Sequence, residues 1–368
     1  MLNKQRCLDV VDNLPEPREV LTSADDAELL KFFEASRPKI LVAGIGGSGC
    51  NTLNRMAELG VHGATLIAMN TDVQHLLRVR ANKKILLGKN LTRGLGAGSN
   101  PQVGEAAAKE SVEEIRNALE GASLVFVTCG LGGGTGTGGA HVVAEVAKSA
   151  GALCVAVVTL PFRSEGHTRR MNALEGLAKL RKHADTTIVI PNDKLLTVVP
   201  DLPLNTAFKV CDEVLSASVK GIAELVTRAG LVNLDFADLK TILQGAGCAV
   251  IGMGESSLDA KPEQRALVAI ETALHSPLLD VDISNANRAL INVVGGEDMT
   301  LREAELMVSE VSRRIHPSSH IIWGARIEKD LPRNTLRVLA VIAGASLPQY
   351  EKEEEGFGAG LELDLDNI

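Results

Sequence analysis

Short apolar segments rich in Val and Ile recur along the first half of the chain, and segments with helical periodicity separate them. The apolar segments are residues 39–47, 64–72, 123–130, 152–161 and 186–193. Apolar residues follow one another in these segments instead of alternating with polar ones, which is typical of parallel strands covered by helices on both faces. We therefore expect a doubly wound α/β domain with a parallel sheet, whose ligands bind beyond the carboxyl ends of the strands.

A different pattern begins near residue 204. Apolar residues recur there at intervals of three and four, at Leu204, Phe208, Cys211, Leu215, Val219, Ile222 and Val226. This spacing predicts a long helix. Because further apolar residues occupy its other faces, we expect the helix to be buried between two domains, and Gly230 is well placed to end it.

Four more strand-like segments alternate with helical patterns between residues 240 and 345, which predicts a second domain of the α+β class. Polar residues with several prolines precede the first strand, and the last residues combine acidic side chains with glycines. We therefore divide the chain into an N-terminal arm (1–37), a ligand-binding α/β domain (38–203), a central helix (204–229), an α+β domain (230–346) and a flexible acidic tail (347–368).

Composition narrows the classes of function. The net charge of −8 argues against a nucleic-acid partner, whose binding surface would be basic. The six cysteines are scattered without a C-x-x-C pair or nearby histidines at zinc spacing, which is typical of a reduced, cytoplasmic chain. The first residues lack the apolar core of a signal peptide, and the longest apolar run is too short to span a bilayer. We therefore expect no direct membrane insertion.

Unusual loops follow three of the expected strands, at residues 44–49, 70–72 and 130–138. Glycine-rich loops that lead into helices expose backbone N–H groups at the positive end of a helix dipole, which suits a phosphate. The alternative is that the glycines only let helices pack closely against strands. Three such loops at one sheet edge favour the ligand.

Two general nucleotide motifs can be tested against these loops. GIGGSG at 44–49 fits G-x-G-x-x-G, and Asp72 lies at a suitable distance to contact a ribose, which would indicate an NAD-dependent oxidoreductase. That interpretation leaves GGGTGTG at 132–138 unexplained, and Asp72 also suits a hydrogen-bonded turn. The P-loop is absent, because Cys50 and Asn51 stand where its lysine and hydroxyl would be.

GLGGGTGTGG at 130–139 resembles the phosphate loop shared by tubulins and the division GTPase FtsZ of bacteria and archaea. Further segments in the same order favour FtsZ over tubulin: GIGGSGCNT, NTD, TRGLGAG, VAVVTLPFRSEG, IPNDKLL, AFKVCDEVL and NLDFADLKTIL. The resemblance covers residues 39–345, and the longer arm together with HIIWGA at 320–325 is closer to archaeal members. It implies a tubulin/FtsZ-like fold that binds GTP or GDP, with Mg²⁺ accompanying the nucleotide and no separate protein metal site.

The resemblance also implies which residues bind the nucleotide. The phosphate side comprises Gly46, Gly47, Ser48, Gly49, Cys50, Asn51, Asn70, Asp72, Ala97, Gly98, Gly133, Gly134, Thr135, Gly136, Thr137 and Gly138. Glu165 and Arg169 match ribose contacts, Asn192 and Asp212 match guanine contacts, and Phe208 also belongs to the implied site. The alternatives are that Glu165 and Arg169 form a surface ion pair and that Asp212 only caps or solvates its helix.

The resemblance places hydrolysis on a loop that carries Asn233, Asp235 and Asp238. If Asp212 touches the base, the helix carries the chain roughly 24 Å away before this loop begins. The two carboxylates are then too far to act on the γ-phosphate of their own subunit. In the family, subunits stack head to tail and this loop completes the neighbour's site, which generates open filaments. The alternative is a solvated turn with a helix cap, which Asp238 could supply.

These features predict a GTP-hydrolysing filament for cell division, concentrated at the division site in the cytoplasm. A tubulin-like filament for cell shape or scaffolding is the second hypothesis, and the NAD-dependent oxidoreductase is the third. The partner is another copy of the chain. A membrane-adaptor protein of unknown identity would bind the tail or the arm, although the acidic sequence LELDLDNI differs from the often basic docking peptide of bacterial relatives.

Overall fold

A computed structural model describes residues 37–61, 63–198, 203–228, 230–232, 234–256, 261–279 and 281–345. The expected tail, the expected arm apart from Arg37, and Asn233 lie outside these ranges. No helix within them has the length and apolar character needed to cross a membrane.

The strands in the described ranges form one sheet in the order β3-β2-β1-β4-β5-β6-β7-β10-β8-β9. All neighbours from β3 to β7 are parallel. Five of these strands match the expected apolar segments: β1 (Ile40–Ile45), β2 (Ala64–Asn70), β4 (Leu124–Gly130), β5 (Leu153–Leu160) and β6 (Thr186–Pro191). The edge strand β3 (Lys83–Leu86) was missed, because it has four residues and begins with two exposed lysines.

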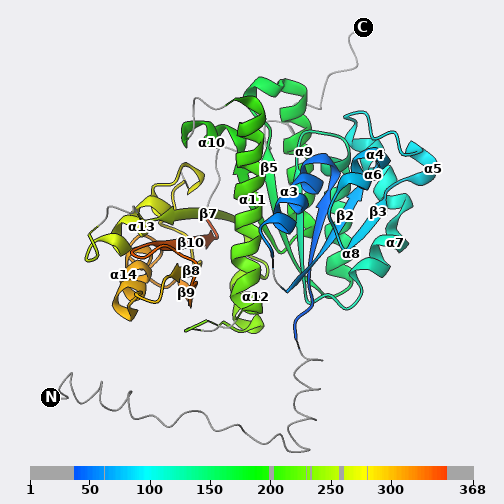
Figure 1. Cartoon of the computed structure of the whole chain (residues 1–368). Coiled ribbons are helices and arrows are strands. Elements are labelled where there is room, and N and C mark those ends of the chain that lie inside the picture. The colour runs from blue at the N-terminus through cyan, green and yellow to red at the C-terminus, as the bar shows by residue number, and fades with distance from the viewer. Residues whose placement is uncertain are drawn as a thin grey trace, which may run out of the picture. The chain divides into compact units, whose positions relative to one another are not determined.

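Helices cover both faces of the parallel strands, which confirms the doubly wound arrangement (Figure 1). Successive strand residues enter opposite cores: Ile40 and Val42 pack with helix α3, whereas Leu41 and Ala43 belong to the core that contains α8. The face of α3 also carries α4, α11 and α12, and the other face carries α6 to α9. The bounds are α3 (Gly46–Glu58), α4 (Val73–Arg78), α6 (Pro101–Glu110), α7 (Val112–Leu119), α8 (Thr135–Ser149), α9 (His167–His183), α11 (Leu204–Thr227) and α12 (Phe236–Leu243).

Shorter elements complete the first part of the chain. These are α5 (Lys89–Thr92), α10 (Asn192–Val198) and the 3₁₀ turn Arg163–Glu165.

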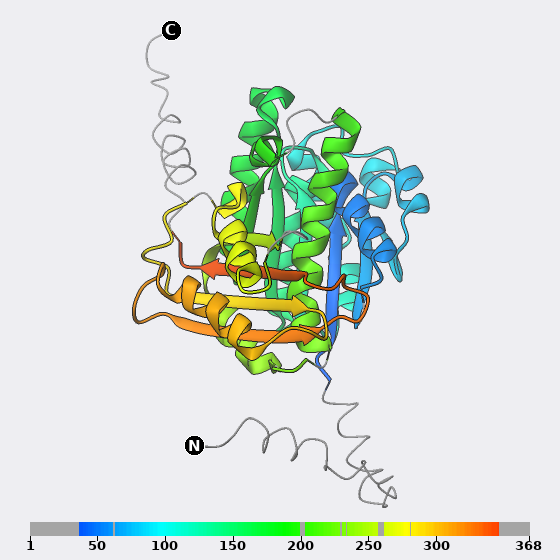
Figure 2. The same ribbon diagram turned by 60° about the vertical axis from the view of Figure 1, so that its left-hand side comes forward.

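The expected strands of the second domain are present as well: β7 (Gly247–Glu255), β8 (Arg288–Gly295), β9 (His320–Ile327) and β10 (Leu336–Ala343). They are joined by α13 (Arg265–Leu274), the 3₁₀ turn Pro277–Leu279 and α14 (Leu301–Ser312). Strand β10 is antiparallel to β7 and β8, and only three residue pairs link β6 to β7. Figure 2 shows β8, β9 and β10 running crosswise to the parallel strands. Because backbone pairing makes the sheet continuous, the domain boundaries stay a prediction.

Helix α11 stands between the two sets of strands (Figure 1). It ends at Thr227, two residues before the expected end at 229. The expectation that Gly230 ends the helix is wrong, because the C-cap is Arg228 and Gly230 does not have the positive φ of a glycine that ends a helix. A Cβ on Gly230 would lie 2.5 Å from the carbonyl oxygen of Ala325, so glycine is required there by the close approach of strand β9.

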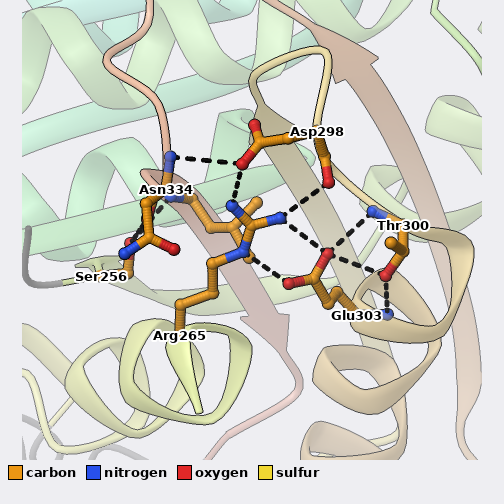
Figure 3. Close-up of polar contacts among 7 residues, drawn as sticks. Ser256, Arg265, Asp298, Thr300, Glu303 and Asn334 are labelled. Carbon is orange, nitrogen blue, oxygen red and sulfur yellow. Dashed lines mark hydrogen bonds and ion pairs between the residues drawn. The ribbon is translucent and has the colours of Figure 1, made fainter. Parts of the chain in front are cut away.

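A buried arginine holds the loops of the second domain together (Figure 3). Arg265 donates from Nε and Nη2 to the carboxylate of Glu303 at 2.5 and 3.0 Å, and it also pairs with the carboxylate of Asp298. The backbone N–H of Asn334, just before β10, donates to the same Asp298 carboxylate. This bidentate pairing ties the starts of α13, α14 and β10 to one charge.

Candidate functional site

The implied nucleotide residues gather at the carboxyl ends of the parallel strands, the upper edge in Figure 1. Helix α3 begins directly after β1, α4 begins two residues after β2, and α8 begins four residues after β4. The N-terminal ends of these helices therefore meet at one sheet edge, as the loop pattern predicted.

The loop at residues 93–99 is built from left-handed backbone. Arg93, Gly94, Gly96, Gly98 and Ser99 all have φ between +52° and +90°. The loop is tied to the end of β2, because the N–H of Gly96 donates to the Thr71 carbonyl at 3.2 Å and Val73 N–H donates to the Gly94 carbonyl at 3.1 Å. This places the implied phosphate residues Ala97 and Gly98 beside those after β2, Asn70 and Asp72.

Side-chain hydrogen bonds brace the phosphate loops against one another. The hydroxyls of Thr71 and Thr135 lie 2.6 Å apart. Thr137 Oγ1 accepts from the backbone N–H of Gly132 at 2.8 Å, which leaves the proton of its hydroxyl free to donate. The two threonines thus organise the loop as well as supplying the hydroxyls that the resemblance implies.

A second set of bonds joins the first two loops. His75 on α4 contacts the Asn51 side chain through Nε2 at 3.0 Å and that of Asn70 through Nδ1 at 3.1 Å. Asp72 caps α4 by accepting from the N–H groups of Gln74 and His75. Asp72 therefore acts as a hydrogen-bonded turn residue, which was the alternative to a ribose contact in the oxidoreductase interpretation.

The glycines of these loops fall into two groups. Most are needed for close packing: a Cβ on Gly138 would lie 2.0 Å from the Pro101 carbonyl oxygen, and one on Gly49 would lie 2.4 Å from that of Thr128. By contrast, a Cβ on Gly133 would meet no atom within 4 Å. The packing interpretation therefore holds for glycines such as Gly138 and Gly49, whereas the backbone at Gly133 faces open space and the ligand interpretation stays a prediction there.

The guanine side of the implied site combines a carboxylate and a buried amide. Burial raises the pKa of Asp212 to about 7, although Thr52 donates a hydrogen bond to its Oδ1 at 3.4 Å. Asn192 is buried at the start of α10, and its Oδ1 has no hydrogen-bond partner. An unpaired buried acceptor and a carboxylate with restricted solvation suit a ligand that brings its own donors.

An aromatic pair flanks this side. Phe208 is 40% exposed and meets Phe162 edge to face, with ring centroids 5.3 Å apart. An exposed ring held in this way can supply a flat apolar surface for a base.

Glu165 and Arg169 form an ion pair at the start of α9, and Glu165 Oε1 also accepts from Phe162 N–H at 2.9 Å. This is the surface ion pair that was the alternative interpretation. The implied ribose contacts stay a prediction.

Helix α12, which Asp235 caps and which contains Asp238, lies at the lower end of α11 in Figure 1. Asp212 lies in the first half of α11, away from α12. Asp235, not Asp238, is the N-cap of α12: its Oδ1 accepts from Asp238 N–H at 2.8 Å, and Asp238 accepts in return from Asp235 N–H. A helix cap, the alternative to a catalytic role, is therefore present, but the side chain of Asp235 remains exposed.

Sequence reasoning missed three residues of the site, Thr52, Thr71 and His75. Thr71 lies inside the quoted NTD segment, and His75 follows it at one helical turn from Asp72. Their polar character was a usable signal, but their partners come from distant segments. The described residues contain no cluster of three or more His, Cys, Asp or Glu suited to a metal ion.

Replacing Gly138 with alanine should destabilise the fold by about 1–3 kcal/mol, because the new Cβ collides with the backbone of α6. Urea unfolding of the two single variants Gly138→Ala and Gly133→Ala measures the difference. Gly133→Ala is the matched control and should change the free energy of unfolding by less than about 0.5 kcal/mol. Equal destabilisation of both variants would contradict the two groups of glycines.

Comparisons with known proteins agree with this geometry. The model for the GTPase domain of the Tubulin/FtsZ family matches residues 39–200, and that for the C-terminal domain of the FtsZ family matches residues 247–346. "Cell division protein FtsZ 1" of Thermococcus kodakarensis is 55% identical over 358 residues, which are 95% of this chain and 94% of the relative. This archaeal relative agrees with the expected archaeal resemblance.

Solved structures show the same fold. An empty FtsZ dimer from M. jannaschii superposes with a TM-score of 0.82 at 56% identity, covering 88% of this chain and 92% of that one. A GTPγS-bound CetZ2 protofilament from Haloferax volcanii gives a TM-score of 0.75 at 21% identity, covering 87% and 99%. The second likeness concerns the fold alone.

Proposed function

This chain belongs to the Tubulin/FtsZ family, and from that premise we propose that it hydrolyses GTP and assembles head to tail into filaments for cell division. The observation that carries the proposal is the separation of the two halves of the site along α11. Asp212 lies in the first half of the helix, and Asp235 and Asp238 follow its C-terminal end. Thr227 lies 15 residues after Asp212, which corresponds to a rise of roughly 22 Å at 1.5 Å per residue.

GTP fits the sheet edge in three ways. Backbone N–H groups at the starts of α3 and α8 suit the phosphates, and the open space above Gly133 leaves room for them. Guanine presents N1–H and N2–H₂ donors, which match the Asp212 carboxylate and the unpaired Asn192 acceptor. An Mg²⁺ ion would be held mainly by phosphates and water, as this ion prefers, because the described residues offer no carboxylate cluster.

Asp235 and Asp238 supply the hydrolytic carboxylates in this proposal. The reciprocal cap fixes both groups at the start of α12 while Asp235 stays exposed. An exposed, oriented carboxylate can accept a proton from the attacking water on a neighbouring subunit's nucleotide. Asn233 is proposed to join them, on the resemblance alone.

Such a contact pairs two different surfaces of the same chain, so it repeats without closing and generates a filament. The named division proteins at 55% identity support division over a role in cell shape. The oxidoreductase hypothesis loses its main support, because the chain's family is one of GTPases and Asp72 caps α4. Cytoplasmic location, concentration at the division site and a membrane adaptor that binds the tail or arm remain part of the proposal.

Phosphate release from GTP should depend steeply on protein concentration. Measured with magnesium over a wide range of dilution, the activity per subunit should rise sharply above a threshold, because each active site needs two subunits. A constant activity per subunit down to the lowest concentration would mean that each chain hydrolyses alone.

Replacing Asp235 with asparagine should lower turnover about a hundredfold while leaving GTP affinity unchanged, because the amide cannot act as a base. Asparagine caps helices as well as aspartate does, so the free energy of unfolding should change little. Asp235→Ala is the comparison: it loses about 1 kcal/mol of stability in addition to turnover. Loss of GTP binding in the folded Asp235→Asn variant would contradict the proposed division of roles.

GTP affinity should weaken about tenfold from pH 8 to pH 6, because Asp212 must lose its proton to accept from guanine. The pKa of about 7 means that the free protein carries that proton below neutrality, so binding releases it. Titration with a fluorescent GTP analogue at each pH measures the effect. Asp212→Asn should bind more weakly with a flat pH profile, and an unchanged slope in that variant would assign the proton to another group.

A further inference from the structure

A fully buried carboxylate lies on α11 near the loop that carries Asp235 and Asp238. The side chain of Glu224 has no exposed surface, and its Oε2 accepts from Arg326 Nη1 at 2.6 Å. Its Oε1 lies 3.6 Å from Arg228 Nε and 4.0 Å from Lys220 Nζ, and no hydrogen bond reaches that atom. One helix residue is thus surrounded by three cations.

Arg326 connects this carboxylate to residues 230–232, the stem of the segment that leads to Asp235. It follows Ala325 on β9, whose carbonyl accepts from the N–H groups of Leu231 and Val232 at 2.8 and 3.2 Å. The N–H of Ala325 donates back to the Val232 carbonyl at 3.3 Å. The strand that holds the stem is therefore joined to α11 by the Glu224–Arg326 pair.

The same cluster also contacts helix α3. Lys220 donates to the carbonyl of Leu59 at 3.0 Å, at the C-terminal end of α3 and therefore at the end away from the implied phosphate loop. Arg228, the C-cap of α11, also lies 4.0 Å from Glu328 just after β9. The charges therefore set the position of α11 against both α3 and β9.

A buried ion pair is poor evidence of stability, since apolar residues of similar volume commonly stabilise a fold equally well. Oε1 of Glu224 and Nε of Arg326 have no hydrogen-bond partners, so this pair is incompletely satisfied. Unlike an apolar contact, such a pair fixes a single relative orientation and register of the two elements that it joins.

We propose that Glu224 and Arg326 are positioning residues for hydrolysis, which hold the stem at residues 230–232 so that Asp235 and Asp238 reach the neighbouring subunit's nucleotide. This inference rests on the proposed function. It assigns no contact between Glu224 or Arg326 and the nucleotide, so their removal should affect turnover and not GTP affinity.

Two variants test the proposal. Glu224→Gln keeps the shape of the side chain and removes its charge. The double variant Glu224→Leu with Arg326→Met removes both charges of the pair, so that neither partner is left as an unpaired buried charge that would destabilise the fold. Both should bind GTP within about twofold of the original chain, whereas turnover per sedimented subunit should fall at least about tenfold, since small displacements of catalytic groups are costly.

Glu255→Gln is the matched control. Glu255 accepts from Arg337 Nε at 2.8 Å, both side chains are about half exposed, and both line the same cleft beside α11 as Glu224. This variant should retain its turnover. Unchanged turnover in the folded double variant would overturn the proposal, because the pair would then serve stability alone.

Mixed filaments identify which site the variant damages. Equal amounts of Glu224→Gln and Asp235→Ala chains should remain as inactive as either alone, because neither supplies a working loop. If Glu224→Gln had instead damaged its own nucleotide site, about a quarter of the interfaces would pair its intact loop with an intact site and regain activity. Such recovery would overturn the inference and leave the filament proposal standing, whereas a constant activity on dilution of the original chain would reject the filament itself.

Discussion

The length and rigidity of α11 constrain everything else in this protein. Its first half packs on α3, where Thr52 Oγ1 donates to the Asp212 carboxylate and Ser216 Oγ donates to the Thr52 carbonyl oxygen. Its second half packs on the C-terminal strands, where Asn292 donates to the Gly221 carbonyl at 3.0 Å. Because one helix joins both contacts, the part of α11 that we propose to bind the base and the end that leads to Asp235 cannot approach each other. This geometry supports the proposal of a site shared between subunits.

Close backbone contact is the second constraint. The start of α8 lies so tightly against α6 and the residues just before α6 that side chains are excluded at Gly104, Gly134 and Gly138. Helix α6 in turn follows the left-handed loop at 93–99. The loops at 93–99 and 132–138, both of which the resemblance assigns to the phosphates, are thereby parts of one packed unit, in which a displacement of one backbone segment displaces the next.

Two of the buried charges in the described residues, Arg265 and Glu224, join distant segments in different ways. Arg265 ties the starts of α13, α14 and β10 and has nearly all its donors paired, which is typical of a structural clamp. The Glu224 cluster differs, because it leaves Oε1 of Glu224 without a hydrogen bond while joining the helix to the loop stem. That contrast is the reason for assigning Glu224 a positioning role and Arg265 a stabilising one.

The sequence by itself determined the parallel strands, the long helix and the phosphate loop, because each depends on residues close together in the chain. Continuous apolar segments predict β1, β4 and β5, and the glycines of 132–138 carry the family resemblance. Tertiary structure alone decided which glycines pack and which leave space, because that depends on a neighbouring helix. It also decided that burial raises the pKa of Asp212 and that Glu224 meets Arg326, 102 residues away. Such pairings follow from how the elements pack, which no local pattern encodes.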